Sequence, residues 1–187
     1  GVRLVGSEMC IRDRIKADQI IIYDENGCKV NRPITTSSLI EGKISLGSYD
    51  HFMQKEIFEQ PQAIRDTLES RITKDEVVVS AFGAKAKKIF DQVEQIQIVA
   101  CGTSYNAGIV AKYWIEDIAK VPCSIEVASE YRYRRPILLN KTLFITLSQS
   151  GETADTLEAL KIAKKINNHI ASICITNSSE SSLSRIS

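Results

Sequence analysis

Two short apolar segments of this chain each run into a loop rich in serine, threonine and glycine, and each loop leads directly into a helix-forming segment. The first covers residues 96–100 and is followed by the loop CGTS at 101–104; the second covers 143–147 and is followed by SQSGET at 148–153. Short continuous apolar runs are typical of strands that are buried on both faces of a sheet. Strand, loop and helix repeated along a chain predict a parallel sheet covered by helices.

The pattern after residue 95 continues in the same way. Residues 124–127 and 171–175 are also typical of strands, and 157–166 of an amphipathic helix. Another helix is indicated by apolar residues spaced three and four apart, which we expect to face the core: Ala107, Val110, Ala111, Trp114, Ile115 and Ile118. The sequence therefore predicts an α/β fold, an open parallel sheet with helices on both faces. Such sheets usually have about five or more strands, so we expect this one to be truncated at its C-terminus and the tail 178–187 to be loose.

The first part of the chain carries a different pattern. Residues 1–14 mix charged and apolar side chains without a period, and we interpret them as an extension foreign to the natural gene. Residues 20–23 and 29–30 flank the polar turn DENG, which predicts a β-hairpin, and 35–47 are expected to form a loop.

A helical connector is predicted between this hairpin and the parallel sheet. Residues 51–60 are charged and helix-prone. Pro61 stands where a new helix would place its first residue, so we expect an amphipathic helix over 61–71. A second helical stretch is predicted over 85–94. Residues 50–94 would together link two folded parts.

Charge and hydropathy exclude two classes of partner. The 187 residues include 24 Lys and Arg against 23 Asp and Glu, a net charge of +1, which gives no field that would favour nucleic acid or an anionic membrane. No apolar run approaches the roughly 18 to 20 residues that span a bilayer, and residues 1–14 lack the apolar core of a signal peptide. We therefore expect neither nucleic acid nor membrane as a partner.

The cysteines indicate the compartment. The sequence has five of them, scattered and without C-x-x-C spacing, and only two histidines that could join them as metal ligands. This set favours neither a structural zinc site nor a disulfide framework. We expect reduced thiols, no metal and a cytoplasmic location.

The two hydroxyl-rich loops carry the chemistry. In a parallel α/β sheet both would lie at the carboxyl ends of strands, where ligands bind. Hydroxyls and the free N–H groups of a helix N-terminus favour an anion. Neither loop contains Lys or Arg, so a small phosphate monoester fits better than a triphosphate with magnesium, and neither G-x-x-x-x-G-K-[ST] nor G-x-G-x-x-G occurs. The alternative is that these hydroxyls only cap helices.

Longer stretches of sequence carry a family resemblance. ACGTSYNAG and LSQSGETADTLEAL resemble the two signature loops of the sugar isomerase (SIS) domain, which has a flavodoxin-like sheet. With HFMQKEIFEQP before them and ASEYRYR between them, residues 15–187 resemble the family of glutamine–fructose-6-phosphate aminotransferases (isomerising). The resemblance implies that 15–49 are the end of a glutaminase domain, 50–94 a linker with the entry to the isomerase domain, and 95–187 an incomplete first SIS subdomain.

The resemblance also implies a reaction. A glutaminase domain with an N-terminal cysteine releases ammonia from glutamine, and the isomerase half condenses it with open-chain fructose 6-phosphate to give glucosamine 6-phosphate. No pyridoxal cofactor or metal is used, and the parent protein is expected to be a homodimer. Glutamine would be a partner only through the glutaminase domain.

The residues that match the family's sugar-phosphate site are Thr103, Ser104, Ser148, Gln149, Ser150 and Thr153. The hydroxyls would donate hydrogen bonds to the phosphate, helped by helix N-terminal amides, and Gln149 would offer an N–H group. The family's catalytic glutamate, lysine and histidine would lie beyond Ser187, so we expect no catalytic residue in this chain and no activity from it alone.

Several alternatives stay open. A regulatory SIS module that binds a phosphosugar, or a stand-alone sugar-phosphate isomerase, would share these loops, although HFMQKEIFEQP and the hairpin speak against a regulator. A truncated piece that is misfolded or merely structural is a third possibility. Glu152 is either a general base or, more in keeping with its position, a charge that favours a helix N-terminus. The run 131–135 mixes Arg with Tyr, which suggests RNA binding or, more simply, an interface or solvated face.

Overall fold

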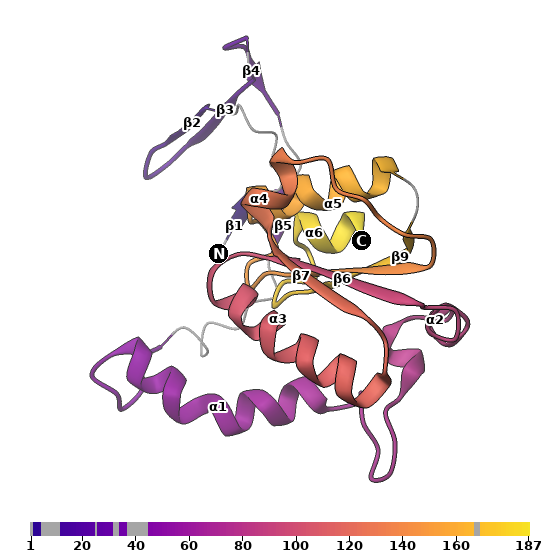
Figure 1. The fold of residues 1–187 in the computed structure, drawn as a ribbon. Coiled ribbons are helices and arrows are strands. Elements are labelled where there is room, and N and C mark those ends of the chain that lie inside the picture. The colour runs from indigo at the N-terminus through magenta and orange to yellow at the C-terminus, as the bar shows by residue number, and fades with distance from the viewer. Residues whose placement is uncertain (1, 5–11, 25, 32–33, 37–44, 167–168) are drawn as a thin grey trace. The chain divides into compact units, whose positions relative to one another are not determined.

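The chain divides into two compact units, Gly1–Val77 and Val78–Ser187 (Figure 1). The structure is a computed structural model and describes residues 2–4, 12–24, 26–31, 34–36, 45–166 and 169–187. Each unit is described by itself below.

The first unit contains the predicted hairpin. β3 (Ile20–Tyr23) and β4 (Lys29–Val30) are antiparallel, with Tyr23 opposite Lys29, and β2 (Arg12–Ile15) adds to the other side of β3. The turn is closed by the Asp24 carboxylate, which accepts the N–H groups of Asn26 at 3.0 Å and Cys28 at 2.8 Å. The hairpin prediction is confirmed, and its local turn chemistry explains why the sequence indicated it.

Two further strands lie where none was predicted. β1 (Val2–Leu4) pairs with β5 (Ile34–Thr36) in antiparallel register. The expectation of a loop is therefore wrong for Thr35 and Thr36, because their strand depends on a partner some 30 residues earlier in the sequence. Residues 37–44 of that predicted loop are outside the described residues. That residues 1–14 have a foreign origin stays a prediction.

The helix of the first unit is continuous through its proline. α1 (Phe52–Leu68) begins after the extended residue His51 and contains Pro61 in its interior. The prediction of a new helix starting at Pro61 is wrong. A proline removes one backbone donor and strains one turn, and the helix-forming residues on either side carry the helix across that gap.

The second unit opens with short helical turns. A 3-10 turn covers Val79–Phe82, and α2 (Ala86–Phe90) occupies only the first part of the helix predicted over 85–94. Residue Ala86 is buried. The chain then enters the sheet at Gln95.

The sheet of the second unit is parallel, with the strand order β7-β6-β8-β9. Its strands are β6 (Gln95–Ala100), β7 (Cys123–Val127), β8 (Thr142–Leu147) and β9 (His169–Ile175). The register places Ala100 opposite both Val127 and Leu147, so β6, β7 and β8 end at the same edge. The predicted open parallel sheet is confirmed, since buried apolar runs are the strongest strand signal in this sequence.

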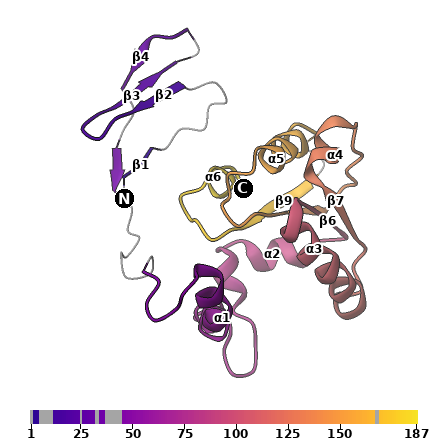
Figure 2. The same ribbon diagram turned by 90° about the vertical axis from the view of Figure 1, so that its left-hand side faces the viewer.

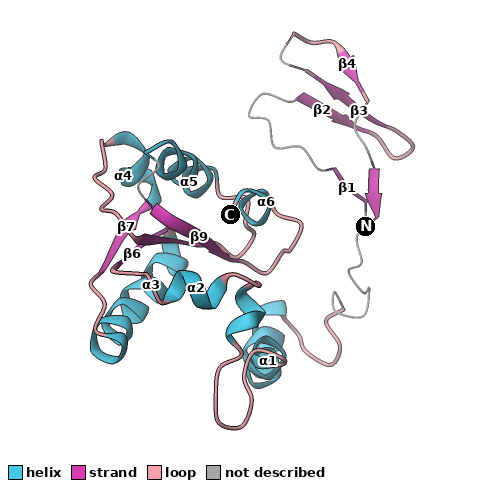
Figure 3. Ribbon diagram, turned by 90° about the vertical axis from the view of Figure 1, so that its right-hand side faces the viewer, coloured by secondary structure: helices cyan, strands magenta, loops and turns pink. Residues whose placement is uncertain are grey.

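Helices cover both faces of this sheet (Figures 2 and 3). α2 and α3 (Gly102–Trp114) lie on one face, over Ile96, Ile98 and Leu143. α4 (Ala128–Tyr133), α5 (Ala154–Ile166) and α6 (Ser182–Ile186) lie on the other, over Val99 and Phe144. The alternation of side chains along β6 divides the core into these two layers.

The apolar stripe of α3 is only partly buried. Gly108 is the residue that sits against the sheet, where a Cβ would lie 2.3 Å from Ile125 Cδ1. This close approach turns Trp114 and Ile118 outward, to exposures of 64% and 79%. The expectation that Trp114 belongs to the core is wrong. The side of α3 that packs on the sheet is centred on Gly108, and Trp114 lies outside it. The helix then widens into a π-helix over Ile115–Ala119 and ends at Lys120, whose φ is 55°.

The C-terminal tail is ordered rather than loose. Ser181 is the N-cap of α6, its side chain accepting the N–H of Ser184 at 3.3 Å, and Leu183 is fully buried. The expectation of a loose tail without a further helix is wrong. A capping serine and one buried leucine are enough to form this short helix because it packs on α5 and β9. This tertiary packing cannot be predicted from the local sequence.

In the part of the chain that the structure describes, no helix combines the length and the apolar character needed to cross a membrane.

The half-buried His169 makes stability depend on pH. Its Nδ1 atom has no hydrogen-bond partner among the described residues, and burial, followed by the nearby charge of Lys164, lowers its pKa below the ordinary 6.5. Below that value the unfolded chain binds the proton more readily than the folded chain, so the free energy of unfolding falls as the pH drops. We expect urea unfolding to show a larger loss of stability from about pH 7.5 to about pH 5.5 in the natural chain than in His169→Phe. An equal loss in both chains would contradict this role of His169.

Candidate functional site

β6 and β8 are neighbours in the strand order, and the connections that follow them diverge. From β6 the chain leaves through α3 on one face of the sheet, and from β8 it leaves through α5 on the other. The connections diverge at this point, where the strand order reverses. Ligands of open α/β sheets bind at such a switch point, outside the carboxyl ends of the strands. Both loops singled out in the sequence follow these two strands.

The loop after β6 offers backbone donors. Cys101 is the N-cap of α3, extended at φ −127° and ψ 154°, and its side chain makes no capping bond. Thr103 and Ser104 lie inside the first turn of the helix, past the capping position. Helix capping therefore does not account for these two hydroxyls. The first N–H groups of a helix have no partner within it and are available to an anion.

Gly102 leaves room at this helix start. Its φ is +57°, and a Cβ built there would meet nothing within 4 Å. Thr103 beside it is exposed, and Ser104 is half-buried. This end of α3 is thus open toward the space outside the strand ends.

The loop after β8 is closed by its own hydroxyls. Ser148, which is 5% exposed, has its Oγ 2.9 Å from Thr153 Oγ1 and accepts the N–H of Gly151 at 3.1 Å. Ser150 Oγ accepts the N–H of Glu152 at 3.2 Å. Gln149 and Ser150 are exposed. The loop therefore has a partly buried hydroxyl pair at its base and two exposed polar residues at its tip.

The structure thus brings Ser148 and Thr153 into direct contact and places Gln149 and Ser150 at the tip of the same loop. It places Thr103 and Ser104 on the helix that follows the neighbouring strand. That all six hold one ligand stays a prediction.

Carboxylates near the second loop are engaged elsewhere. Glu152 Oε1 accepts the N–H of Ser182, the first residue of α6, at 2.9 Å. Asp155 pairs with Arg132 of α4 at 2.5 Å, and this hydrogen bond raises the pKa of the arginine. The sequence position of Glu152 predicted an interaction with a helix N-terminus, and Glu152 does bond to one, that of α6.

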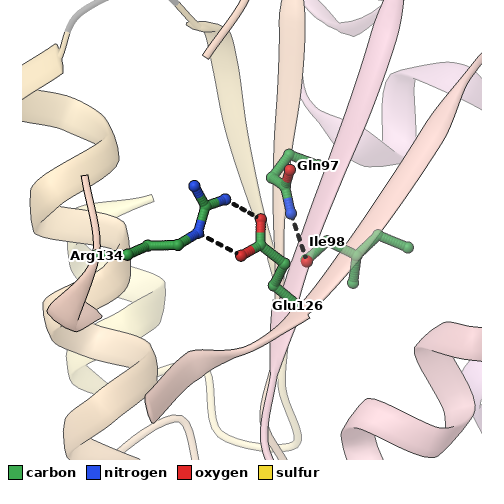
Figure 4. Close-up of polar contacts among 4 residues, drawn as sticks. All are labelled: Gln97, Ile98, Glu126 and Arg134. Carbon is green, nitrogen blue, oxygen red and sulfur yellow. Dashed lines mark hydrogen bonds and ion pairs between the residues drawn. The ribbon is translucent and has the colours of Figure 1, made fainter. Parts of the chain in front are cut away.

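The basic run of residues 131–135 covers the end of α4 and the two residues after it, and its last three residues are exposed. Tyr131 is fully buried, and its ring meets that of Phe144 edge-on at 5.6 Å. Arg134 pairs with both carboxylate oxygens of Glu126 (Figure 4). It also lies 5.4 Å from the centre of the Tyr131 ring. Burial raises the pKa of Tyr131 to about 12, with Glu126 adding to the rise. Arg132 and Arg134 therefore hold α4 in place. The local sequence does not reveal this role, because their acidic partners lie 23 and 8 residues away, respectively.

The described cysteines are free thiols: Cys28, Cys101, Cys123 and Cys174. Burial raises the pKa of Cys123 to about 11, so its thiolate is scarce at neutral pH. Among the described residues no group of three His, Cys, Asp or Glu side chains could hold a metal ion.

The fold and the two loops define a class of protein. Residues 89–187 match the family model of the SIS domain, and the chain belongs to the SIS-domain family. Its curated relatives carry a more particular name. The chain is 52% identical over 167 residues to a protein of Vibrio vulnificus named glutamine–fructose-6-phosphate aminotransferase (isomerizing), and 46% identical over 171 residues to one of the same name from Francisella tularensis. It spans 27% and 28% of their lengths, and 89% and 91% of the chain is matched.

Solved structures agree with this fold. The C-terminal domain of glucosamine-fructose-6-phosphate aminotransferase from Francisella tularensis superposes with a TM-score of 0.73 and 52% identity, over 76% of this chain and 40% of that one. Tagatose-6-phosphate ketose/aldose isomerase from Escherichia coli superposes with a TM-score of 0.58 over 73% of this chain and 37% of that one. At 20% identity this second likeness concerns the fold alone.

Proposed function

We propose that this chain is the sugar-phosphate-binding part of a glutamine–fructose-6-phosphate aminotransferase. The observation that carries the proposal is the Ser148–Thr153 hydroxyl pair, 2.9 Å apart, in a loop at the switch point of an SIS sheet. About half of the matched residues are identical to enzymes of that name, which supports fructose 6-phosphate and glucosamine 6-phosphate as the ligands.

In this proposal the phosphate is held by neutral donors. The hydroxyls of Thr103, Ser104, Ser148, Ser150 and Thr153 and an N–H group of Gln149 would contact its oxygens. The helix starts of α3 and α5 would add free N–H groups and the positive ends of their dipoles. Hydroxyls can also rotate to suit a mono- or dianion.

The remainder of the reaction would belong to the rest of a longer protein. We propose that residues 15–49 are the end of a glutaminase domain, 50–94 a linker and 95–187 part of the first SIS subdomain. Glutamine would act through the glutaminase domain, and the whole protein would be a cytoplasmic homodimer without cofactor or metal. The free thiols of the described cysteines support that compartment.

Ligand-induced stabilisation tests the binding proposal. A ligand that binds only the folded chain raises its melting temperature in proportion to ln(1 + [L]/Kd). We expect fructose 6-phosphate and glucosamine 6-phosphate to raise the melting temperature and free fructose to leave it unchanged. Equal effects of fructose and fructose 6-phosphate on the melting temperature would contradict a site that binds the phosphate group.

We also expect the purified chain to form no glucosamine 6-phosphate from fructose 6-phosphate and ammonia. Among the six proposed site residues there is no carboxylate, imidazole or amine to move protons. Measurable product would refute this assignment and favour an isomerase-like activity of the chain itself.

A further inference from the structure

The loop after β8 is fastened along its whole length to a second segment, residues 175–183. At the base of the loop, the N–H of Ser148 donates to the carbonyl of Ile175 at 3.1 Å. At its tip, the carbonyl of Gln149 accepts the N–H of Asn177 at 3.1 Å and the hydroxyl of Thr176 at 3.3 Å. The exposed tip is thus held by backbone bonds from outside the loop.

The second half of the loop is held by the start of α6. The carbonyl of Gly151 accepts the N–H of Leu183 at 3.1 Å, and Glu152 Oε1 accepts the N–H of Ser182 at 2.9 Å. Ser181, which is fully buried, lies so close to Gly151 that a Cβ there would be 2.1 Å from its Oγ. Glycine is therefore required at this point of contact.

These bonds fix the direction of a backbone donor. The carbonyl of Gln149 and the N–H of Ser150 belong to one trans peptide plane and point in opposite directions. Because the carbonyl points at Asn177, the Ser150 N–H points away from segment 175–183. Without the bonds to that segment, the exposed peptide between Gln149 and Ser150 could rotate.

We propose that Glu152 is a positioning residue, and that with segment 175–183 it holds the Ser148–Thr153 loop in its phosphate-binding shape before the ligand arrives. This rests on the proposed function of the loop. Its carboxylate acts through the N–H of Ser182, which anchors α6 and thereby the bonds from Leu183 and Asn177 to the loop. The alternative roles are a general base and a simple stabiliser of the fold.

Three substitutions separate these roles in calorimetric titrations with glucosamine 6-phosphate. In Glu152→Ala the bond to Ser182 is lost, and we expect binding to weaken about tenfold, as for a charged hydrogen bond. In Glu152→Gln the amide oxygen still accepts from Ser182, and binding should stay within about threefold of the natural chain. Glu158→Ala removes a carboxylate of α5 that pairs with Lys161 at 3.5 Å, and this variant should bind like the natural chain.

Natural affinity in Glu152→Ala would overturn the proposal. Equal losses in Glu152→Ala and Glu152→Gln would overturn it as well, since they would assign the effect to charge rather than position. A loss explained by unfolding would appear as a lowered fraction of folded chain in circular dichroism.

A measurement without ligand keeps this proposal separate from the proposed function. Amide hydrogen exchange reports the bonds that Asn177 and Leu183 donate to the loop. We expect faster exchange of both amides in Glu152→Ala than in Glu158→Ala and Glu152→Gln. Unchanged exchange would overturn the positioning role even if the ligand binds. Faster exchange in a chain that binds no sugar phosphate would refute the proposed function instead.

Discussion

Replacing Gly151 with alanine is expected to destabilise the second unit by about 3 kcal/mol or more. Gly151 has φ +68°, a conformation that an L residue adopts only with strain. Its new methyl group would also lie 2.1 Å from Ser181 Oγ and 2.4 Å from Ser181 Cβ, and both atoms belong to a fully buried residue. Neither Ser181 nor the start of α6 can move without breaking the bonds to the loop. Urea unfolding of the variant measures this loss.

Gly102→Ala is the matched control. Gly102 has a similar φ of +57°, but a Cβ there meets nothing within 4 Å. Only the backbone strain remains, so we expect a loss of about 1 to 2 kcal/mol. Equal losses in the two variants would contradict the close contact between Gly151 and Ser181.

Replacing Ser148 with alanine is expected to weaken binding of glucosamine 6-phosphate by about tenfold or more. The variant loses a donor at the base of the loop, and it removes the hydroxyl that the N–H of Gly151 and the hydroxyl of Thr153 contact. The chain should remain folded, with a stability loss of about 1 to 3 kcal/mol from the unsatisfied buried groups. Calorimetric titration gives the affinity, and urea unfolding gives the stability.

Ser124→Ala serves as the control for this substitution. Ser124 is an exposed serine near the start of β7, at the opposite end of that strand from the predicted cradle. We expect its affinity to match that of the natural chain. A Ser148→Ala chain that binds as tightly as Ser124→Ala would remove Ser148 from the site.

The parallel sheet could be predicted from the sequence because its strands are buried on both faces. β6 and β8 are mostly apolar, and their sequences can be recognised as buried strands without knowledge of a partner. β1 and β5 could not be predicted in the same way, since their pairing joins residues far apart in the chain. α4 was missed because its short helix is held by Arg132 and Arg134 through ion pairs with distant carboxylates.

Which side of a helix faces the sheet also could not be predicted from the sequence. The stripe that includes Trp114 indicated an amphipathic helix correctly, but the rotation of α3 follows from the fit of Gly108 against Ile125. The small residue Gly108 contacts the sheet, whereas hydrophobicity alone would place the larger Trp114 there. The same holds for α6, where Ser181 fills the space beside Gly151.

For the candidate site, the sequence indicated the loops but not what holds them. Serine, threonine and glycine between a strand and a helix are apparent from the sequence alone. The bonds from Asn177, Ser182 and Leu183 to the second loop are donated by backbone N–H groups, which most residue types could supply. These bonds therefore could not be predicted from the residue types at those positions.

Calorimetric titration of the natural chain with glucosamine 6-phosphate tests the central claim most directly. We expect saturable binding at one site per folded chain, competed by inorganic phosphate and lost in Ser148→Ala. A folded chain that gives no saturable heat with glucosamine 6-phosphate would contradict the assignment of the sugar-phosphate site to the loops after β6 and β8.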